Sequence, residues 1–160
     1  MSNEVERRFL VDINRLPKLS QGSLQVQGYF NNAPSDQPEI RIRVEESKAT
    51  LTLKTSITAV TRQEFEYEIP LKDALALLSL TEKRIRKVRH HLKLNSKTWV
   101  IDFFQDENSP LVIAEIELKN EDEAFEKPLW TTKEVTEDLR FTAISLAFDP
   151  YSQWVSKEGT

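Results

Sequence analysis

Charged side chains recur at every second position along several segments of this 160-residue chain. Glu4, Glu6 and Arg8 give the first example. Since a β-strand points successive side chains to opposite faces, these three would share one surface. The same spacing recurs in the pairs Arg41/Arg43, Lys87/Arg89 and Glu115/Glu117. Several such pairs of both signs, on strands that otherwise alternate apolar and charged residues, suggest a polar interior that holds a metal ion and an anion.

The charged faces of the expected strands carry similar numbers of acidic and basic side chains. The acids are Glu4, Glu6, Glu64, Glu66, Asp102, Glu115 and Glu117. The bases are Arg8, Arg41, Arg43, Lys54, Arg62, Lys87 and Arg89. Acids this close together need cations, because their mutual repulsion otherwise forces them to take up protons. A phosphate chain uses both signs, since arginine and lysine bind its oxygens while carboxylates hold divalent ions that bridge to the same oxygens.

The sequence around each charged residue shows how strongly that residue indicates a functional role. Glu115 and Glu117 interrupt an apolar run, where two acids need partners, and a metal role and a structural role remain equally open for them. Asp102 stands in a similar apolar segment. For an isolated pair such as Arg41/Arg43, a strand face in contact with water is the simpler interpretation.

Composition excludes several classes of function. The net charge of −4 argues against a nucleic-acid-binding surface, which would be strongly basic. No apolar run approaches the roughly 20 residues that cross a bilayer, and the acidic N-terminus predicts no signal peptide. The chain has no cysteine, which excludes disulfides and thiolate metal sites. With oxygen ligands predominating, Mg²⁺ or Mn²⁺ is the expected metal.

The length predicts one domain over residues 1–160. The periodicity predicts eight strands joined mainly as antiparallel hairpins. The expected strands are residues 3–12, 23–30, 38–46, 49–55, 61–69, 83–94, 97–106 and 110–118. Turn-forming residues separate some of them, at 33–36, 95–97 and 108–110.

Helices are expected between and after the strands. Leucines at helical spacing predict one after Pro70. A capping-box pattern at residues 120–123 predicts a short second helix. Residues 136–138 would cap a third, with its apolar face over 139–147. Residues 150–160 are expected to form a polar tail with a helical turn.

The strands leave two architectures open. A sandwich would place the charged faces in water. A closed barrel would enclose them and put the helices on its apolar outside, and closure would remove exposed strand edges. Periodicity alone does not choose between them.

Taken in order, these motifs resemble the CYTH domain of the triphosphate tunnel metalloenzymes, especially the short bacterial single-domain type. Residues 4–8 match the family's N-terminal ExExK signature, with Arg8 in place of lysine. The other matching segments are residues 27–30, 39–43, 51–54, 62–69, 85–89, 99–102, 114–118 and 133–136. Each motif is weak alone, but together they cover nearly the whole chain, from about residue 3 to residue 147.

The resemblance implies a mainly β, α+β fold, an eight-stranded antiparallel closed barrel with charges inside and helices packed outside. It implies Mg²⁺- or Mn²⁺-dependent hydrolysis of inorganic tripolyphosphate to pyrophosphate and phosphate. The family also includes thiamine triphosphatases, RNA triphosphatases and a class of adenylyl cyclases, so another triphosphate substrate or ATP cyclisation stays open. A polyphosphate-binding module without turnover, or a β-domain that acts through protein contacts, are alternatives of a different class.

The resemblance also assigns roles to individual residues. The implied metal ligands are Glu4, Glu6, Glu64, Glu66, Asp102, Glu115 and Glu117. The implied substrate-binding residues are Arg8, Tyr29, Arg41, Arg43, Lys54, Arg62, Lys87, Arg89 and Lys133. For catalysis, a second metal near Glu4 and Glu6 would activate water, with Lys87 as a candidate base.

Two departures from the family pattern bear on these roles. Arg8 keeps the charge of the family lysine but changes its shape. Residues 130–133 lack a glycine that the family commonly has before the Glu-Val-Thr segment at 134–136. Its absence would alter the loop or helix that plugs one end of the tunnel. We expect a cytoplasmic monomer or homodimer with neither nucleic acid nor membrane as a partner.

Overall fold

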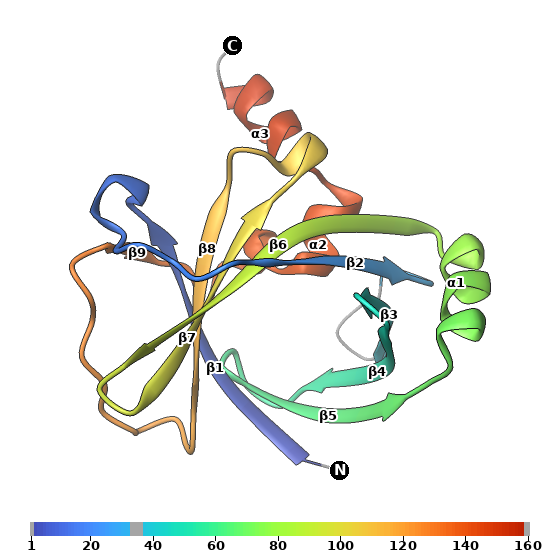
Figure 1. Cartoon of the computed structure of the whole chain (residues 1–160), viewed down its shortest axis with the longest axis horizontal. Helices are drawn as coiled ribbons and strands as arrows, with labels where there is room; N and C mark the ends of the chain where they lie inside the picture. Colours follow the sequence, from blue (N-terminus) through green and yellow to red (C-terminus); the bar gives the residue numbers. More distant parts are fainter. Residues whose placement is uncertain (1, 33–36, 159–160) are drawn as a thin grey trace.

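Nine strands, within the described residues 2–32 and 37–158, form one antiparallel sheet that closes on itself in this computed structural model (Figure 1). They are β1 (Ser2–Val11), β2 (Ser23–Tyr29), β3 (Glu39–Glu45), β4 (Lys48–Ser56), β5 (Thr61–Glu68), β6 (Lys83–Leu94), β7 (Lys97–Phe104), β8 (Val112–Leu118) and β9 (Thr131–Glu134). The strand order is β5-β4-β3-β2-β6-β7-β8-β1-β9, and pairing of β1 with β5 completes an eight-stranded barrel. The closed barrel expected from the resemblance is confirmed, and the sandwich is excluded. The turn predicted at residues 33–36 lies outside the described residues.

Strand β1 closes the barrel because its two halves pair with different partners. Near its start Glu4 lies opposite Arg62 of β5. Further along, Arg8 lies opposite Glu115 of β8. The N-terminal acids are thereby placed between the charged faces of β5 and β8, which are far away in the sequence.

The outward face of β1 packs in an aromatic core. Phe9 is fully buried and contacts Trp99 edge to face, with ring centroids 5.7 Å apart. Trp99 contacts Trp130 in the same way, at 5.3 Å. Alternation along β1 therefore separates an apolar outside from a charged inside.

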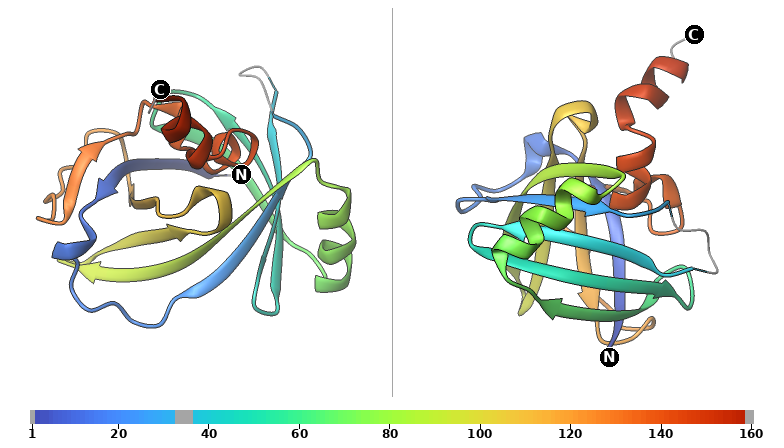
Figure 2. Two further views of the ribbon diagram at one scale, coloured as in Figure 1. Left: turned by 90° about the horizontal axis from the view of Figure 1, so that it is seen from above. Right: turned by 90° about the vertical axis from the view of Figure 1, so that its right-hand side faces the viewer.

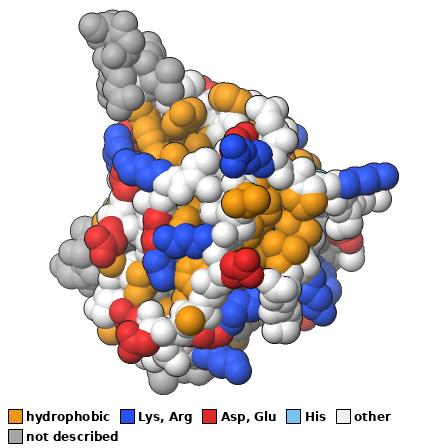
Figure 3. Space-filling view, turned by 90° about the vertical axis from the view of Figure 1, so that its left-hand side faces the viewer, with side chains coloured by type: hydrophobic (Ala, Val, Ile, Leu, Met, Phe, Trp, Pro, Cys, Tyr) orange, Lys and Arg blue, Asp and Glu red, His pale blue; other side chains and the backbone are white. Residues whose placement is uncertain are grey.

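Elsewhere on the surface, the face in Figure 3 carries positive and negative side chains interspersed with exposed apolar ones.

One end of the lumen is filled with hydrocarbon. Two residues beyond the charged positions of β6 and β8, the inward side chains become Ile85 and Ile113, and both join a buried apolar cluster. Leu146 of α2 (Ala143–Phe148) belongs to this cluster, and so does Trp154 of α3 (Tyr151–Glu158). The polar part of the lumen is thus closed at this end by the C-terminal segment.

Helix α1 (Leu71–Leu80) covers β3 and β4 from outside, where Ala74 and Leu78 pack on Ile42 (Figure 2). A Cβ on Gly28 of β2 would lie 2.6 Å from the Thr81 hydroxyl, so this close approach requires glycine. None of the helices in the described ranges has the length and apolar character needed to cross a membrane.

The helix predicted at residues 120–123 is wrong. The Glu123 carboxylate accepts from the Lys119 backbone N–H at 2.5 Å and from the Lys97 ammonium, which ties the segment to β7 as a turn. The helix predicted after residues 136–138 is divided. Asp138 caps a 3₁₀ turn, η3 (Leu139–Phe141), and Thr142 caps α2. The short strand β9 was not predicted from the sequence.

Candidate active site

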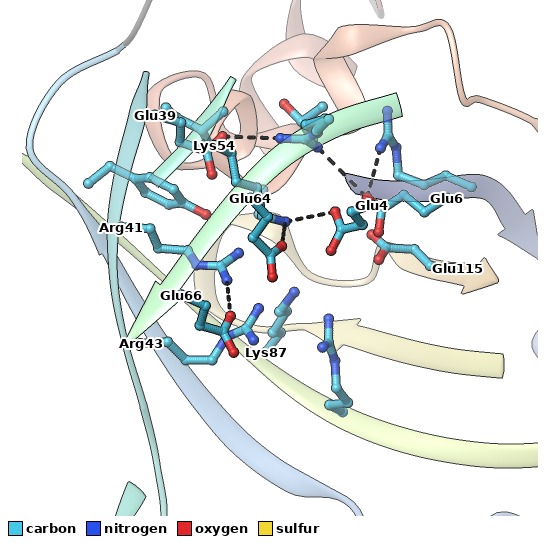
Figure 4. A pocket seen from close by; sticks show the side chains of 17 residues that line it. Glu4, Glu6, Glu39, Arg41, Arg43, Lys54, Glu64, Glu66, Lys87 and Glu115 are labelled. Atoms are coloured by element: carbon cyan, nitrogen blue, oxygen red, sulfur yellow. Dashed lines mark hydrogen bonds and ion pairs between the residues drawn. The ribbon is translucent and has the colours of Figure 1, made fainter. Parts of the chain in front are cut away.

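The inward charged side chains line one pocket in the barrel (Figure 4). Its charged and aromatic lining comprises Glu4, Glu6, Arg8, Tyr29, Glu39, Arg41, Arg43, Lys54, Arg62, Glu64, Glu66, Lys87, Arg89 and Glu115. Thr142, Ala143 and Ile144 complete it from the C-terminal segment. Strands β1 to β6 and β8 all contribute, so the barrel brings together residues from most of the chain.

The acids on β1 are held by bases from β4 and β5. The Lys54 Nζ lies 3.0 Å from Glu4 Oε1 and 3.3 Å from Glu64 Oε2. Arg62 lies 3.7 Å from the Glu6 carboxylate. These side chains are largely buried, so each charge depends on its partners more than it would at the surface.

Arg8 joins the acidic side of the pocket to the C-terminal segment. Its Nη1 lies 3.3 Å from Glu6 Oε1, and its Nη2 donates to the Thr136 carbonyl at 2.8 Å. The side chain is only 3% exposed. The planar guanidinium makes both contacts at once through its fork of donors, and the single ammonium of a lysine lacks this fork.

Two acids of β8 lack such partners. Within the described residues, neither Glu115 nor Glu117 forms an ion pair within 4.0 Å. Burial raises the pKa of Glu115, and the neighbouring Glu6 raises it further. Glu117 stands at the exposed end of the site. Its partial burial raises its pKa most, and the negative charges of Glu4 and Glu6 raise it further. The negative charge here is therefore incompletely compensated.

The opposite side of the pocket is basic. Lys87 Nζ and the Nε and Nη2 of Arg89 each donate to the Asp102 carboxylate at 2.8 Å. Burial lowers the pKa of Lys87 to about 8, although Asp102 opposes the shift. Burial alone would raise the pKa of Asp102, but Lys87 and Arg89 hold it well below its usual range.

Arg43 and Arg41 offer donors that the protein itself does not fully use. Arg43 Nε donates to the Gln27 side-chain carbonyl at 2.9 Å, and burial lowers the pKa of Arg43 to about 10. The Nε of Arg41 is buried without a hydrogen-bond partner in the described structure. Tyr29 is fully buried; its hydroxyl accepts from Gln27 at 2.8 Å, and burial raises its pKa. Buried donors without acceptors fit an anionic ligand.

The donor set fits a hard divalent cation, although the described residues form no preformed cage. In the described part of the chain, no three His, Cys, Asp or Glu side chains are already arranged to hold a metal ion. Glu4 and Glu6 are instead occupied by Lys54, Arg62 and Arg8. The oxygen donors, together with the burial and repulsion that raise the pKa of Glu115, fit Mg²⁺-type ligation in place of these ion pairs.

Three of the residues predicted for the site do not line the pocket. Asp102 lies behind Lys87 and Arg89, and Glu117 lies beyond Glu115 at the exposed end of β8. Lys133 is exposed on β9. The roles assigned to Glu117 and Lys133 stay predictions.

The structure also adds lining residues that the sequence analysis did not single out. Glu39 faces the lumen and lies 3.4 Å from Arg62. It stands two residues before Arg41, so the same alternation would have identified it. Residues 142–144 had no such signal, because their position depends on the folding of the C-terminal segment against the barrel end.

Comparison with known proteins gives consistent results. The CYTH domain model matches residues 2–147. An inorganic triphosphatase of Acetivibrio thermocellus is 40% identical over 158 residues, which cover 96% of this chain and 99% of that protein. An inorganic triphosphatase of Nitrosomonas europaea is 36% identical, covering 90% and 96%. The crystal structure of the inorganic triphosphatase NE1496 superposes with a TM-score of 0.66 at 34% identity, covering 93% of this chain and 97% of that one.

Glu115→Gln is expected to raise the thermal unfolding midpoint of the metal-free protein at pH 8. A pKa raised by folding means that the ionised carboxylate destabilises the native state, and this loss grows as the pH rises through the raised pKa. The neutral amide removes the loss, and each kcal/mol corresponds to about 2–4 °C in a chain of this size. Differential scanning calorimetry of both proteins at pH 8 measures the change. A midpoint equal to or below that of the wild type contradicts the assignment of Glu115 as an uncompensated acid.

Proposed function

This chain belongs to the CYTH domain family, and we propose that it hydrolyses inorganic tripolyphosphate to pyrophosphate and phosphate inside the barrel. The observation that carries the proposal is one lumen in which, among the described residues, an acid and several bases are incompletely paired. Burial lowers the pKa of Lys87, and the nearby Arg89 and Arg43 lower it further. Burial raises the pKa of Glu115, and the nearby Glu6 raises it further. A phosphate chain with a divalent ion satisfies both sides at once.

The basic side would bind the phosphate oxygens. Among the described residues, Arg43 and Arg41 have donors free for charge-assisted hydrogen bonds, and arginine forks match phosphate in geometry as well as charge. In this structure Lys54 pairs with Glu4 and Arg62 pairs with Glu6. A divalent ion bound to these acids would replace the two bases, which would then bind the phosphate chain.

The acidic side would hold the metal, Mg²⁺ or Mn²⁺. We assign this role mainly to Glu4, Glu6, Glu115 and Glu117, with Glu64 beside them. Glu66 lies nearer the basic side, 3.8 Å from Arg41, and its predicted metal role is the less supported. When bound, the ion supplies charge neutralisation of the phosphates and a lowered pKa for water.

Lys87 is the base that we propose for the reaction. Water attacks the terminal phosphorus in line, the phosphorus–oxygen bond to the pyrophosphate unit breaks, and the proton lost from water passes to the neutral amine of Lys87. The pKa of about 8 leaves an appreciable neutral fraction at mildly alkaline pH. Pyrophosphate leaves as the anion held by the arginines.

The lining favours an inorganic substrate over one with an aromatic base. Among the described residues that line the pocket, Tyr29 is the one aromatic side chain. It is fully buried within the apolar cluster that fills the barrel end, so its ring is not free to stack on a base. The relatives named inorganic triphosphatase support the same substrate.

A substrate panel tests the proposed reaction. Tripolyphosphate, ATP, thiamine triphosphate and longer polyphosphate are each supplied with Mg²⁺ or Mn²⁺, and phosphate release is measured. We expect the highest kcat/KM with tripolyphosphate, loss of activity with EDTA, and its return when either ion is added in excess. Faster release from ATP would point to another triphosphatase. Binding of tripolyphosphate without product at saturating Mg²⁺ would indicate a binding module.

Arg43→Ala should weaken tripolyphosphate binding by about 1.5–3 kcal/mol, the range for a hydrogen bond to a charged group, which is about 10- to 150-fold in Kd. Calorimetric titration without divalent ion measures binding in the absence of turnover. Arg86→Ala is the matched control, since Arg86 lies on the outer face of β6 with its side chain 50% exposed. An unchanged Kd for the Arg43 variant would remove this residue from the binding surface.

The rate should rise with pH if Lys87 is the base. Lys87 must be neutral to accept a proton, so kcat/KM, which reports the free enzyme, is expected to increase about tenfold per pH unit below pH 8 and to level off above about pH 9. Initial rates at tripolyphosphate concentrations well below KM and at saturating metal, from pH 6 to pH 10, give the profile. A rate that is flat from neutral to alkaline pH would exclude Lys87 from this role.

A further inference from the structure

Asp102 differs from the acids that line the pocket in its burial and in the use of both its oxygens. It lies on β7, is only 1% exposed, and binds two cations through both carboxylate oxygens, whereas Glu6 contacts Arg8 and Arg62 through one oxygen. Its Oδ2 accepts from Lys87 Nζ and Arg89 Nη2, and its Oδ1 accepts from Arg89 Nε, each at 2.8 Å. Both carboxylate oxygens are therefore committed to bases of the substrate side.

The backbone fixes this arrangement. In the antiparallel ladder of β6 and β7, Asp102 lies directly opposite Arg89. Lys87 follows two residues away on the same face of β6. The bidentate contact to Arg89 holds the guanidinium plane, and the single contact to Lys87 holds its ammonium. One carboxylate thus sets the direction of two adjacent cationic heads.

A cation in the pocket would not reach Asp102. Lys87 and Arg89 line the pocket, whereas Asp102 does not, so its partners stand between it and the cavity. Glu115 is the contrasting case, because it lines the pocket and forms no ion pair within 4.0 Å among the described residues. A metal ion would also have to displace buried cations from both oxygens of Asp102, whereas, within the described structure, the contacts of Glu6 with Arg8 and Arg62 use one oxygen and leave the other open.

We propose that Asp102 is a positioning residue of the phosphate-binding side, which holds Lys87 and Arg89 toward the substrate, and is not a metal ligand. This inference rests on the proposed function for its choice of anion. It departs from the metal role that the family resemblance implies for this position. Without the carboxylate, Lys87, Arg89 and Arg43 would repel one another, and their heads would no longer converge on one phosphate chain.

The test compares Asp102→Asn with Glu115→Gln in two separate titrations. Mn²⁺ binding is measured by electron paramagnetic resonance without substrate, and tripolyphosphate binding is measured by calorimetry without metal. We expect Asp102→Asn to keep the Mn²⁺ Kd within twofold and to raise the tripolyphosphate Kd at least tenfold. Glu115→Gln should raise the Mn²⁺ Kd at least tenfold. Asp106→Asn is the matched control, at an acid 58% exposed in the loop after β7.

A double-variant cycle separates positioning from a general structural role. If Asp102 acts through Lys87, the effect of Asp102→Asn on the tripolyphosphate Kd should be at least fivefold smaller in a Lys87→Met background. An equal effect in both backgrounds overturns the positioning role. Circular dichroism checks the fold of each variant. If Asp102→Asn alone does not fold, Mn²⁺ binding is measured on the double variant with Lys87→Met, which removes the cation together with the carboxylate.

A tenfold loss of Mn²⁺ affinity in either folded Asp102 variant overturns the inference, and so does an unchanged tripolyphosphate Kd in Asp102→Asn. Both titrations are independent of turnover. If the wild-type protein binds tripolyphosphate without hydrolysing it, the proposed reaction fails while the assignment of Asp102 is still tested.

Discussion

The structure depends on mutual compensation of charges that a closed barrel removes from bulk water. Pairing of β1 with β5 on one side and β8 on the other makes the closure, and the same pairing brings the acids of β1 against Lys54 and Arg62. Inside the lumen, an acid without a base nearby is destabilising, and so is a base without an acid. Ion pairs across the barrel therefore support the same closure that encloses them.

The compensation is incomplete at two places, and both face the cavity. Glu115 has a raised pKa because it is buried beside Glu6, and Arg43 has a lowered pKa because it is buried beside Arg41 and Arg89. A barrel built only for stability would pair such residues or replace them with apolar ones. A divalent ion at one place and an anion at the other would complete the balance, so the instability of the ligand-free lumen is a source of ligand affinity. The apolar cluster that fills the barrel end offsets this cost with packing that does not depend on ligand.

Much of the fold followed from alternation along the strands. The charged positions of β1, β3, β6 and β8 were correctly assigned to one face from their spacing, and the same alternation would have included Glu39. Periodicity did not decide between barrel and sandwich, because that choice depends on the pairing of β1 with β5, some sixty residues apart. The capping pattern at residues 120–123 failed because a tertiary contact with Lys97 holds the segment as a turn. Alternation also cannot tell Asp102 from Glu115, since both face inward and only the register with Arg89 separates their surroundings.

The central claim is that one lumen holds the metal on its acidic side and the phosphate chain on its basic side. A crystal structure of the protein with Mn²⁺ and tripolyphosphate, with anomalous data collected at the manganese edge, tests it most directly. We expect manganese among the carboxylates of Glu4, Glu6 and Glu115, with phosphates between this site and Lys87. Manganese and phosphate bound only on the outer surface, with the ion pairs of the lumen unchanged, would contradict it.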